Sequence, residues 1–365
     1  MLSSELRERL YKIAIVIVSS YLFLLGIKLL GHSFKLFGSG FAENMIQMTS
    51  NPIAGLLLGI VATSLIQSSS TTTSIVVGLV AGNALTLPNA IPIIMGANIG
   101  TTITNTLVAM GHITNRVEFK RAFSASIVHD FFNISAVLLF FPLEMKFHFI
   151  QKTAILFEKG FSGAGGMKFF NPLKTILNPV INLLDGIFGA LPDSNILLMV
   201  FSLILMFGAL AYLIKTMRSL VLDKLEIVIN NYLFKNDLYG FIFGILMTIT
   251  VQSSSVTTSI IIPLAGAGFV SVRQIFPYTL GANIGTTVTA MLAAMATQNS
   301  VAVTVAFAHL IFNVFGILVF YPLKSIPISL AEYVAEKASH STRNLLTFIV
   351  IYILLHFIPL AIIWL

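Results

Sequence analysis

Long apolar stretches separated by short polar connectors run along the whole chain. A helix needs about 20 apolar residues to cross a membrane. Stretches that meet this length are residues 13–31, 88–110, 122–143, 196–214, 274–297, 300–322 and 345–365. Apolar runs of this length are typical of transmembrane helices. The pattern therefore predicts an all-α polytopic membrane protein.

Two further apolar stretches, residues 51–82 and 240–267, are interrupted by polar residues at their centres. The interruptions read Gln67-Ser68-Ser69-Ser70 and Gln252-Ser253-Ser254-Ser255. Each flank has only about a dozen residues, whereas a crossing needs about 20. A polar tip at membrane depth is tolerated only where it lines a cavity or is buried in protein. We therefore expect two re-entrant helical hairpins, named hairpin 1 (51–82) and hairpin 2 (240–267).

The stretches at 88–110 and 274–297 each contain a polar, glycine-rich interruption. It reads Gly96-Ala97-Asn98-Ile99-Gly100-Thr101-Thr102 in the first and Gly281-Ala282-Asn283-Ile284-Gly285-Thr286-Thr287 in the second. Glycine in a helix interior costs about 1 kcal/mol relative to alanine. Unwound helix can also present its backbone carbonyls to an ion. We expect both stretches to be discontinuous transmembrane helices.

Both motifs occur twice at one offset, because each residue of the second copy lies 185 positions after its equivalent. The chain then divides into a first repeat (1–143), a linker (144–195), a second repeat (196–322), and a C-terminal connector with the last span (323–365). Each repeat contains an odd number of crossings, so the second enters the membrane inverted. Inverted repeats with discontinuous helices are typical of secondary transporters.

Composition agrees with a membrane protein and narrows its partners. Of the 365 residues 56% are hydrophobic and 10% are charged, with a mean hydropathy of +0.94. Soluble domains have about 25% charged residues. The net charge of +7 comes from basic residues scattered in connectors, which indicates cytoplasmic loops and a cytoplasmic N-terminus rather than nucleic-acid binding. The apolar run after the basic N-terminus could be a signal peptide, but we expect an uncleaved first helix.

The polar interruptions offer oxygen donors without a Lys, Arg or Cys side chain. Hydroxyl, amide and backbone carbonyl oxygens suit a hard cation such as sodium. The half-helices that begin after the two tips also present free N–H groups and the positive end of a helix dipole, which favour an anion. Cation ligands beside anion-binding helix starts indicate that a cation and an anion bind together, as in a symporter.

The twin Gln-Ser-Ser-Ser hairpins resemble the type II sodium-dependent phosphate cotransporter family. Further matching stretches are Ile91-Pro92-Ile93-Ile94-Met95-Gly96-Ala97-Asn98-Ile99-Gly100-Thr101, Arg121-Ala122-Phe123 and Val128-His129-Asp130-Phe131-Phe132-Asn133. The resemblance covers nearly the whole chain, and the compact length looks like a bacterial member. It implies sodium-coupled uptake of inorganic phosphate through the cell membrane by alternating access. It also implies a homodimer with independent protomers in the lipid bilayer, no cofactor, and sodium ions as co-substrates.

The two kinds of interruption supply the predicted ligands. We expect phosphate at the tips, on Gln67, Ser68, Ser69, Ser70, Gln252, Ser253, Ser254 and Ser255. We expect sodium to bind on the two polar spans, 88–110 and 274–297, and on the span 122–143. The predicted ligands are Asn98, Thr101, Thr102, Asp130, Asn133, Asn283, Thr286 and Thr287.

Asp130 is the acid in the core of its span, and its equivalent in the second repeat is Leu310. A carboxylate in a membrane core is costly unless a cation compensates it. Electrogenic members of the family have an aspartate in this stretch, which implies three sodium ions per divalent phosphate. The alternative is that Asp130 pairs with Arg121 or lies near the interface. Asn115 stands where the family often has aspartate, which puts a sodium contact there in doubt.

Three other functions are compatible with parts of the pattern. A membrane hydrolase could use Ser69 or Ser254 with His129 and Asp130, but adjacent residues project about 100° apart on a helix. A transporter of sulfate or a dicarboxylate could use the same helix starts. A channel should show a continuous polar stripe, whereas these polar residues gather at two tips. We expect a transporter and not an enzyme.

Overall fold

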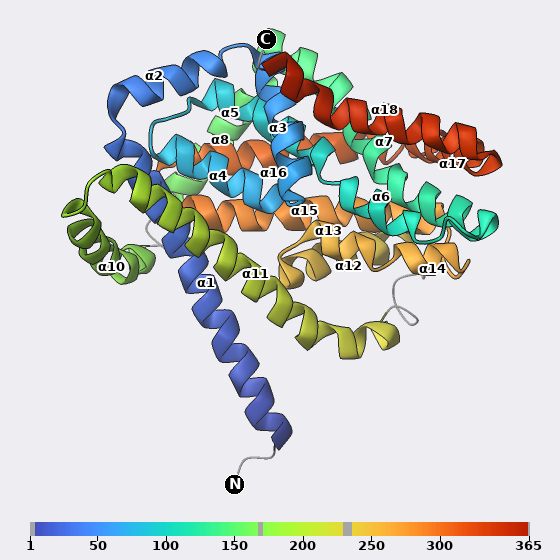
Figure 1. Ribbon diagram of the computed structural model, residues 1–365, viewed down its shortest axis with the longest axis horizontal. Coiled ribbons are helices and arrows are strands. Elements are labelled where there is room, and N and C mark those ends of the chain that lie inside the picture. The colour runs from blue at the N-terminus through green and yellow to red at the C-terminus, as the bar shows by residue number, and fades with distance from the viewer. Residues whose placement is uncertain (1–3, 167–170, 229–235, 364–365) are drawn as a thin grey trace.

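Figure 1 shows the computed structural model, in which every described element is a helix. The structure describes residues 4–166, 171–228 and 236–363. The helices are α1 (Ser4–Leu36), α2 (Gly38–Met48), α3 (Pro52–Ile66), α4 (Ser69–Ala81), α5 (Leu87–Gly100), α6 (Ile103–Met110), α7 (Arg116–Phe147), α8 (Phe149–Gly163), α10 (Asn171–Gly189), α11 (Ser194–Val228), α12 (Asp237–Val251), α13 (Ser254–Ser259), α14 (Ile262–Gly266), α15 (Val272–Thr297), α16 (Ser300–Phe320), α17 (Ser325–His340) and α18 (Thr342–Ile363).

Helices long and apolar enough to cross a membrane account for most of the expected spans. Among the described residues they are Leu6–Leu36, Leu87–Met110, Arg116–Phe147, Ser194–Met217, Val272–Thr297 and Ser300–Phe320. The last expected span corresponds to α18, and residues 364–365 lie outside the described residues. The prediction of an all-α polytopic membrane protein is confirmed.

The Gln-Ser-Ser-Ser segments separate helices that are individually too short to cross. α3 and α12 have 15 residues each, and α4 has 13. In hairpin 2 the second arm consists of α13 and α14, with 6 and 5 residues. A crossing would need about 20 residues. The chain enters hairpin 1 through a sharp bend of 94° between α2 and α3.

The two repeats use equivalent helix pairs. α3 packs on α5 as α12 packs on α15, and the first spans α1 and α11 pack on each other. α8, which follows the first repeat, packs along α16 of the second repeat. α17, which follows the second repeat, packs along α7 of the first. α8 and α10 make most of the expected 144–195 linker helical, and residues 167–170 of it lie outside the described residues. In Figure 1 the lower part of α1 projects beyond the other helices.

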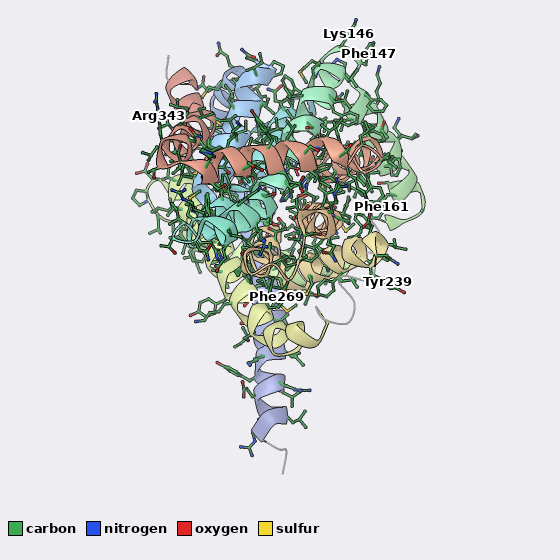
Figure 2. All side chains as sticks on the ribbon, turned by 90° about the vertical axis from the view of Figure 1, so that its right-hand side faces the viewer. Lys146, Phe147, Phe161, Tyr239, Phe269 and Arg343 are labelled. Carbon is green, nitrogen blue, oxygen red and sulfur yellow. The ribbon has the colours of Figure 1, made fainter. Side chains whose placement is uncertain are left out.

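The outer surface carries many exposed apolar side chains, as a bilayer requires. Phe147 and Tyr239 lie at the edge of the molecule in Figure 2, and Phe269 is 75% exposed. Conversely, buried polar side chains from Ser, Thr, Asn and His gather in the interior. Buried polar groups need partners or ligands, so this interior is where a polar site is expected.

Glycines allow α3 and α5, and likewise α12 and α15, to approach closely. A Cβ on Gly96 would lie 2.0 Å from the carbonyl oxygen of Leu56, and one on Gly59 would lie 2.0 Å from that of Ile93. Equivalent contacts occur in the second repeat, where a Cβ on Gly281 would lie 2.0 Å from a backbone oxygen. Real Cβ atoms do not approach backbone this closely, so only glycine fits there.

A Gly96→Ala substitution is expected to destabilise the protein because the helix backbones must separate. Overpacking costs about 1–3 kcal/mol, which should lower the midpoint of thermal unfolding in detergent by several degrees. Gly208→Ala is the matched control, because nothing lies within 4 Å of the Cβ that it would add. Equal unfolding midpoints for the two variants would contradict this account of the crossing.

The structure differs from the prediction that both polar spans are discontinuous. The first breaks into α5 and α6 at Thr101–Thr102, whereas α15 continues through Thr286 and Thr287 without interruption. The threonines of both copies donate to carbonyls of their own helix. Only the Thr102 hydroxyl also bonds to Asp130. The residue equivalent to Asp130 in the second repeat is Leu310.

Candidate functional site

Each hairpin tip consists of a left-handed glutamine followed by an extended serine. Gln67 ends α3 at φ 57°, and Gln252 ends α12 at φ 58°. Ser68 and Ser253 then cap the next half-helix, where their hydroxyls accept the N–H three residues later at 3.2 and 3.3 Å. A left-handed residue is common at the C-terminal end of a helix. The repeated conformation shows that the backbone turns in the same way at both tips.

The second tip meets the first repeat inside the protein. The Ser255 hydroxyl lies 3.3 Å from the carbonyl oxygen of Thr101 and 3.5 Å from that of Gln67. One turn further along, Thr258 donates to the side-chain oxygen of Asn105 at 2.9 Å. The start of α13 therefore lies against both the tip of hairpin 1 and the break between α5 and α6.

The predicted phosphate ligands differ in burial and in hydrogen bonding. Ser69, Ser70, Ser253, Ser254 and Ser255 are buried, Ser68 and Gln252 are half-buried, and Gln67 is exposed. The side-chain oxygen of Gln252 accepts from Thr289 at 2.9 Å, and its amide nitrogen donates to the Ile249 carbonyl at 2.5 Å. Gln252 is thus held in place by its own repeat, so the two glutamines are not equivalent.

Buried amides connect the two repeats near the broken span. His129 Nε2 lies 2.7 Å from the side-chain oxygen of Asn283, whose amide nitrogen donates to Asn133 Oδ1 at 2.9 Å. Asn133 in turn donates to the backbone oxygen of Asn98 at 2.7 Å. His129 is therefore a hydrogen-bonded interior residue. Each amide oxygen keeps a second lone pair, which is what a sodium ion would need.

The predicted threonine ligands bond to their own helices. Thr101 donates to the carbonyl of Ala97 at 2.9 Å, and Thr286 donates to that of Ala282 at 3.1 Å. Thr287 donates to the carbonyl of Ile284 at 2.7 Å. These bonds use the hydroxyl proton and leave lone pairs on the oxygen. The arrangement is compatible with cation ligands and with ordinary helix back-bonding.

Asp130 is buried, at 4% exposed, and its two carboxylate oxygens have different surroundings. Oδ1 accepts from the hydroxyls of Thr102 and Tyr352. Oδ2 is buried and has no hydrogen-bond partner among the described residues. A buried carboxylate oxygen without a donor is costly, and a cation at Oδ2 would remove that cost. The structure does not show the alternative pairing with Arg121, which is exposed and lies against Gly268.

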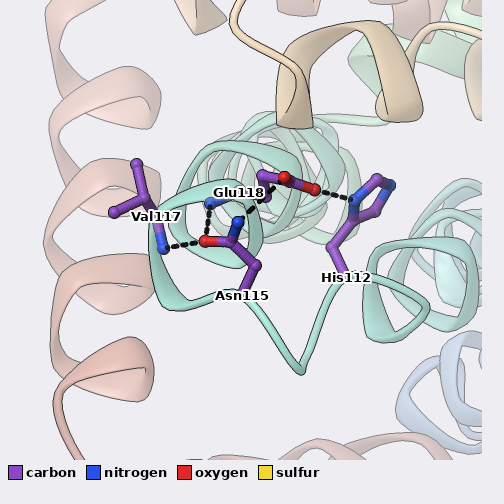
Figure 3. A network of polar contacts seen from close by, with 4 residues as sticks. All are labelled: His112, Asn115, Val117 and Glu118. Atoms are coloured by element: carbon purple, nitrogen blue, oxygen red, sulfur yellow. Dashed lines mark hydrogen bonds and ion pairs between the residues drawn. The ribbon is translucent and has the colours of Figure 1, made fainter.

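Asn115 is a helix cap in this structure (Figure 3). Its side-chain oxygen accepts from the N–H groups of Val117 and Glu118 at 3.1 and 3.3 Å. Its amide nitrogen donates to the Glu118 carboxylate at 2.9 Å, and His112 lies 3.2 Å from the same carboxylate. Asn115 is exposed and its oxygen already holds the start of α7.

The hydrogen bonds do not assemble a serine hydrolase triad. His129 bonds through Nε2 to Asn283, and its Nδ1 has no partner within the described ranges. Asp130 bonds to hydroxyls and not to the histidine. A triad needs the acid to orient the imidazole and the imidazole to reach the serine.

Three residues that contact the tips or Asp130 were not among the predicted ligands: Thr258, Asn105 and Tyr352. Thr258 and Asn105 join hairpin 2 to α6, and the match of Thr258 to Thr73 at the repeat offset was an available signal. Tyr352 comes from α18, outside both repeats. It is one tyrosine in an apolar span, and nothing in the pattern of the sequence distinguishes it.

Comparisons with known proteins give one consistent result. The Na+/Pi-cotransporter family matches residues 22–168 and 204–326. Sodium-dependent phosphate transport protein 2A of Rattus norvegicus is 32% identical, over 98% of this chain and 68% of that protein. The 2A protein of Ovis aries is 34% identical, over 96% of this chain and 67% of that protein. The 2B protein of Homo sapiens is 32% identical, over 86% of this chain and 59% of that protein.

No solved structure matches the chain. The family match includes both tips, the broken span and Asp130, and the match to the 2A proteins extends over nearly the whole chain. The resemblance seen in the motifs is thereby confirmed, and the chain belongs to the Na+/Pi-cotransporter family.

Proposed function

We propose that this protein is a secondary active transporter that takes up inorganic phosphate together with sodium ions. The observation that carries the proposal is the meeting of two equally built tips, where Ser255 of hairpin 2 lies at Gln67 and Thr101 of the first repeat. A symporter needs one interior place that segments from both inverted repeats share.

The tips supply the groups that an oxyanion needs. The starts of α4 and α13 present backbone N–H groups and the positive end of the helix dipole. Serine hydroxyls at both starts can donate to phosphate as well. No Lys or Arg lies in either tip, so the charge of the phosphate has to be balanced by the cations that bind with it.

The cations have oxygen ligands next to the tips. Asp130 Oδ2 is a buried carboxylate oxygen for which the described residues supply no partner, and Thr102, which bonds to Oδ1, lies at the break between α5 and α6. Asn133 and Asn283 add amide oxygens, and the Asn283 amide nitrogen donates to Asn133 Oδ1 across the repeats. Sodium favours such hard ligands. Phosphate would bind weakly until these sites are filled, and this dependence couples the two gradients.

The stoichiometry and orientation are part of the same proposal. A buried aspartate in the place that the electrogenic members of the family use supports three sodium ions per divalent phosphate. Basic connectors support a cytoplasmic N-terminus in the cell membrane. The family consists of transporters, and we propose that this chain has no catalytic activity. Assembly as a homodimer with independent protomers stays a prediction.

Uptake of labelled phosphate into proteoliposomes is expected to require an inward sodium gradient. Replacing sodium by potassium or choline should reduce uptake to the level of protein-free vesicles. Uptake that is unchanged by this replacement would overturn the symport mechanism. Excess unlabelled sulfate or succinate tests which anion is transported, and we expect neither to compete with labelled phosphate. Competition by either one would favour the alternative of another oxyanion.

A further inference from the structure

A residue from outside both repeats reaches the buried acid. Helix α18 lies beyond residue 326, where the family match ends, and packs against α3 and α17. The hydroxyl of its Tyr352 lies 3.4 Å from Asp130 Oδ1 and 3.3 Å from the hydroxyl of Thr106. The carboxylate of the first repeat is therefore contacted by a segment that has no place in the duplicated unit.

The direction of these bonds follows from the chemistry of the groups. An ionised carboxylate only accepts hydrogen bonds, so Tyr352 donates to Asp130 and accepts from Thr106. Thr102 also bonds to Oδ1. Both hydroxyl donors thus act on the same oxygen, while Oδ2 is buried without a partner among the residues that the structure describes. The two hydroxyls orient the carboxylate so that its second oxygen is the one left to bind a cation.

The position of the Tyr352 ring is determined by packing. Phe348 and His356 lie one turn away on either side, at centroid distances of 5.4 and 4.2 Å. Phe348 in turn packs edge-on against Phe123 of α7, at 4.8 Å. His356 is fully buried, and its Nδ1 lies 2.9 Å from the Tyr352 carbonyl. The hydroxyl is therefore held relative to α7, the helix that carries Asp130.

We propose that Tyr352 is a positioning residue of the sodium site at Asp130, through which α18 controls sodium affinity. The inference rests on the proposed sodium coupling at Asp130. Partners that orient a metal ligand commonly change metal affinity by about 10–100-fold when they are removed. The second repeat has Leu310 in place of the acid. A hydroxyl that orients a carboxylate is therefore needed in the first repeat only.

The test compares Tyr352→Phe with wild type by thermal unfolding in detergent, with sodium chloride titrated against potassium chloride at constant ionic strength. A ligand that binds only the folded state stabilises the protein more as the ligand concentration rises. We expect the sodium concentration for half-maximal stabilisation to rise about tenfold, because phenylalanine keeps the ring and loses the hydroxyl. Tyr333→Phe on the exposed face of α17 is the control and should match wild type.

A second measurement separates positioning from general damage. In an Asp130→Asn background, adding Tyr352→Phe should change the sodium response no further, because the orienting bond has lost its target. In uptake assays Tyr352→Phe should raise the half-saturating sodium concentration and leave the maximal rate within about twofold. A fall in maximal rate with an unchanged sodium requirement would overturn the proposal.

Failure of this inference and failure of the proposed function give different results. If sodium stabilises wild type and Tyr352→Phe equally, the role of Tyr352 is wrong and sodium coupling stands. If sodium neither stabilises wild type nor drives its uptake, the proposed function is wrong, and this inference falls with it. Should Tyr352→Phe not fold, Thr106→Val removes the hydroxyl that donates to Tyr352. We expect a smaller shift in the same direction, and no shift would overturn the proposal.

Discussion

Replacing Asp130 by asparagine is expected to reduce sodium-driven phosphate uptake at least tenfold at the sodium concentration that half-saturates wild type. The carboxylate is buried, and its Oδ2 has no donor in the part of the chain that the structure describes. Interactions with a charged group contribute about 1.5–3 kcal/mol, which corresponds to about 10–100-fold in affinity. The remaining uptake should also lose its dependence on membrane potential, because the sodium ion held at Asp130 would no longer be carried, and two sodium ions with divalent phosphate move no net charge.

The measurement is uptake into proteoliposomes at a series of imposed potassium diffusion potentials. Asp193→Asn is the matched control, because Asp193 is exposed in the turn before α11 and its left-handed backbone suits asparagine. Wild-type uptake that ignores voltage would refute the three-sodium stoichiometry. Voltage dependence that survives in Asp130→Asn would mean that the coupling charge lies elsewhere.

The repeat explains why much of the site could be predicted from the sequence. Two copies at a constant offset of 185 residues showed that the tips are one structural unit used twice. The same glutamine conformation and the same serine cap recur in both copies. Local sequence determines a capped tip, because the serine side chain satisfies the helix start within a few residues.

Contacts between segments far apart in the chain could not be predicted in the same way. Tyr352 meets Asp130 only because α18 folds back across the first repeat, and no local pattern records that path. The unbroken α15 was missed for a related reason, since its glycines and threonines match those of the broken span. The motif alone therefore could not distinguish an interrupted span from a continuous one.

A Ser255→Ala variant is expected to raise the apparent KM for phosphate about tenfold or more. Ser255 is buried at the start of α13, and its hydroxyl lies at the carbonyl oxygens of Thr101 and Gln67. These carbonyls are neutral acceptors, whereas a bound phosphate is a charged one, and a hydroxyl bonds about twice as strongly to a charged acceptor. The hydroxyl should therefore turn to phosphate when it arrives, and alanine cannot replace it.

Ser259→Ala on the same helix is the control, because the Ser259 hydroxyl donates to the Val256 carbonyl of its own helix at 3.0 Å. The phosphate KM of Ser259→Ala should stay within about twofold of wild type, because the substitution leaves the groups that would bind phosphate unchanged. The equivalent serine in hairpin 1, Ser70, provides the stronger comparison. If both tips share one phosphate, Ser70→Ala should raise the KM too, and the double variant should bind phosphate less well than either single variant. A Ser70→Ala variant with unchanged KM would mean that hairpin 2 alone holds the anion, and the shared interior place would then belong to the cations.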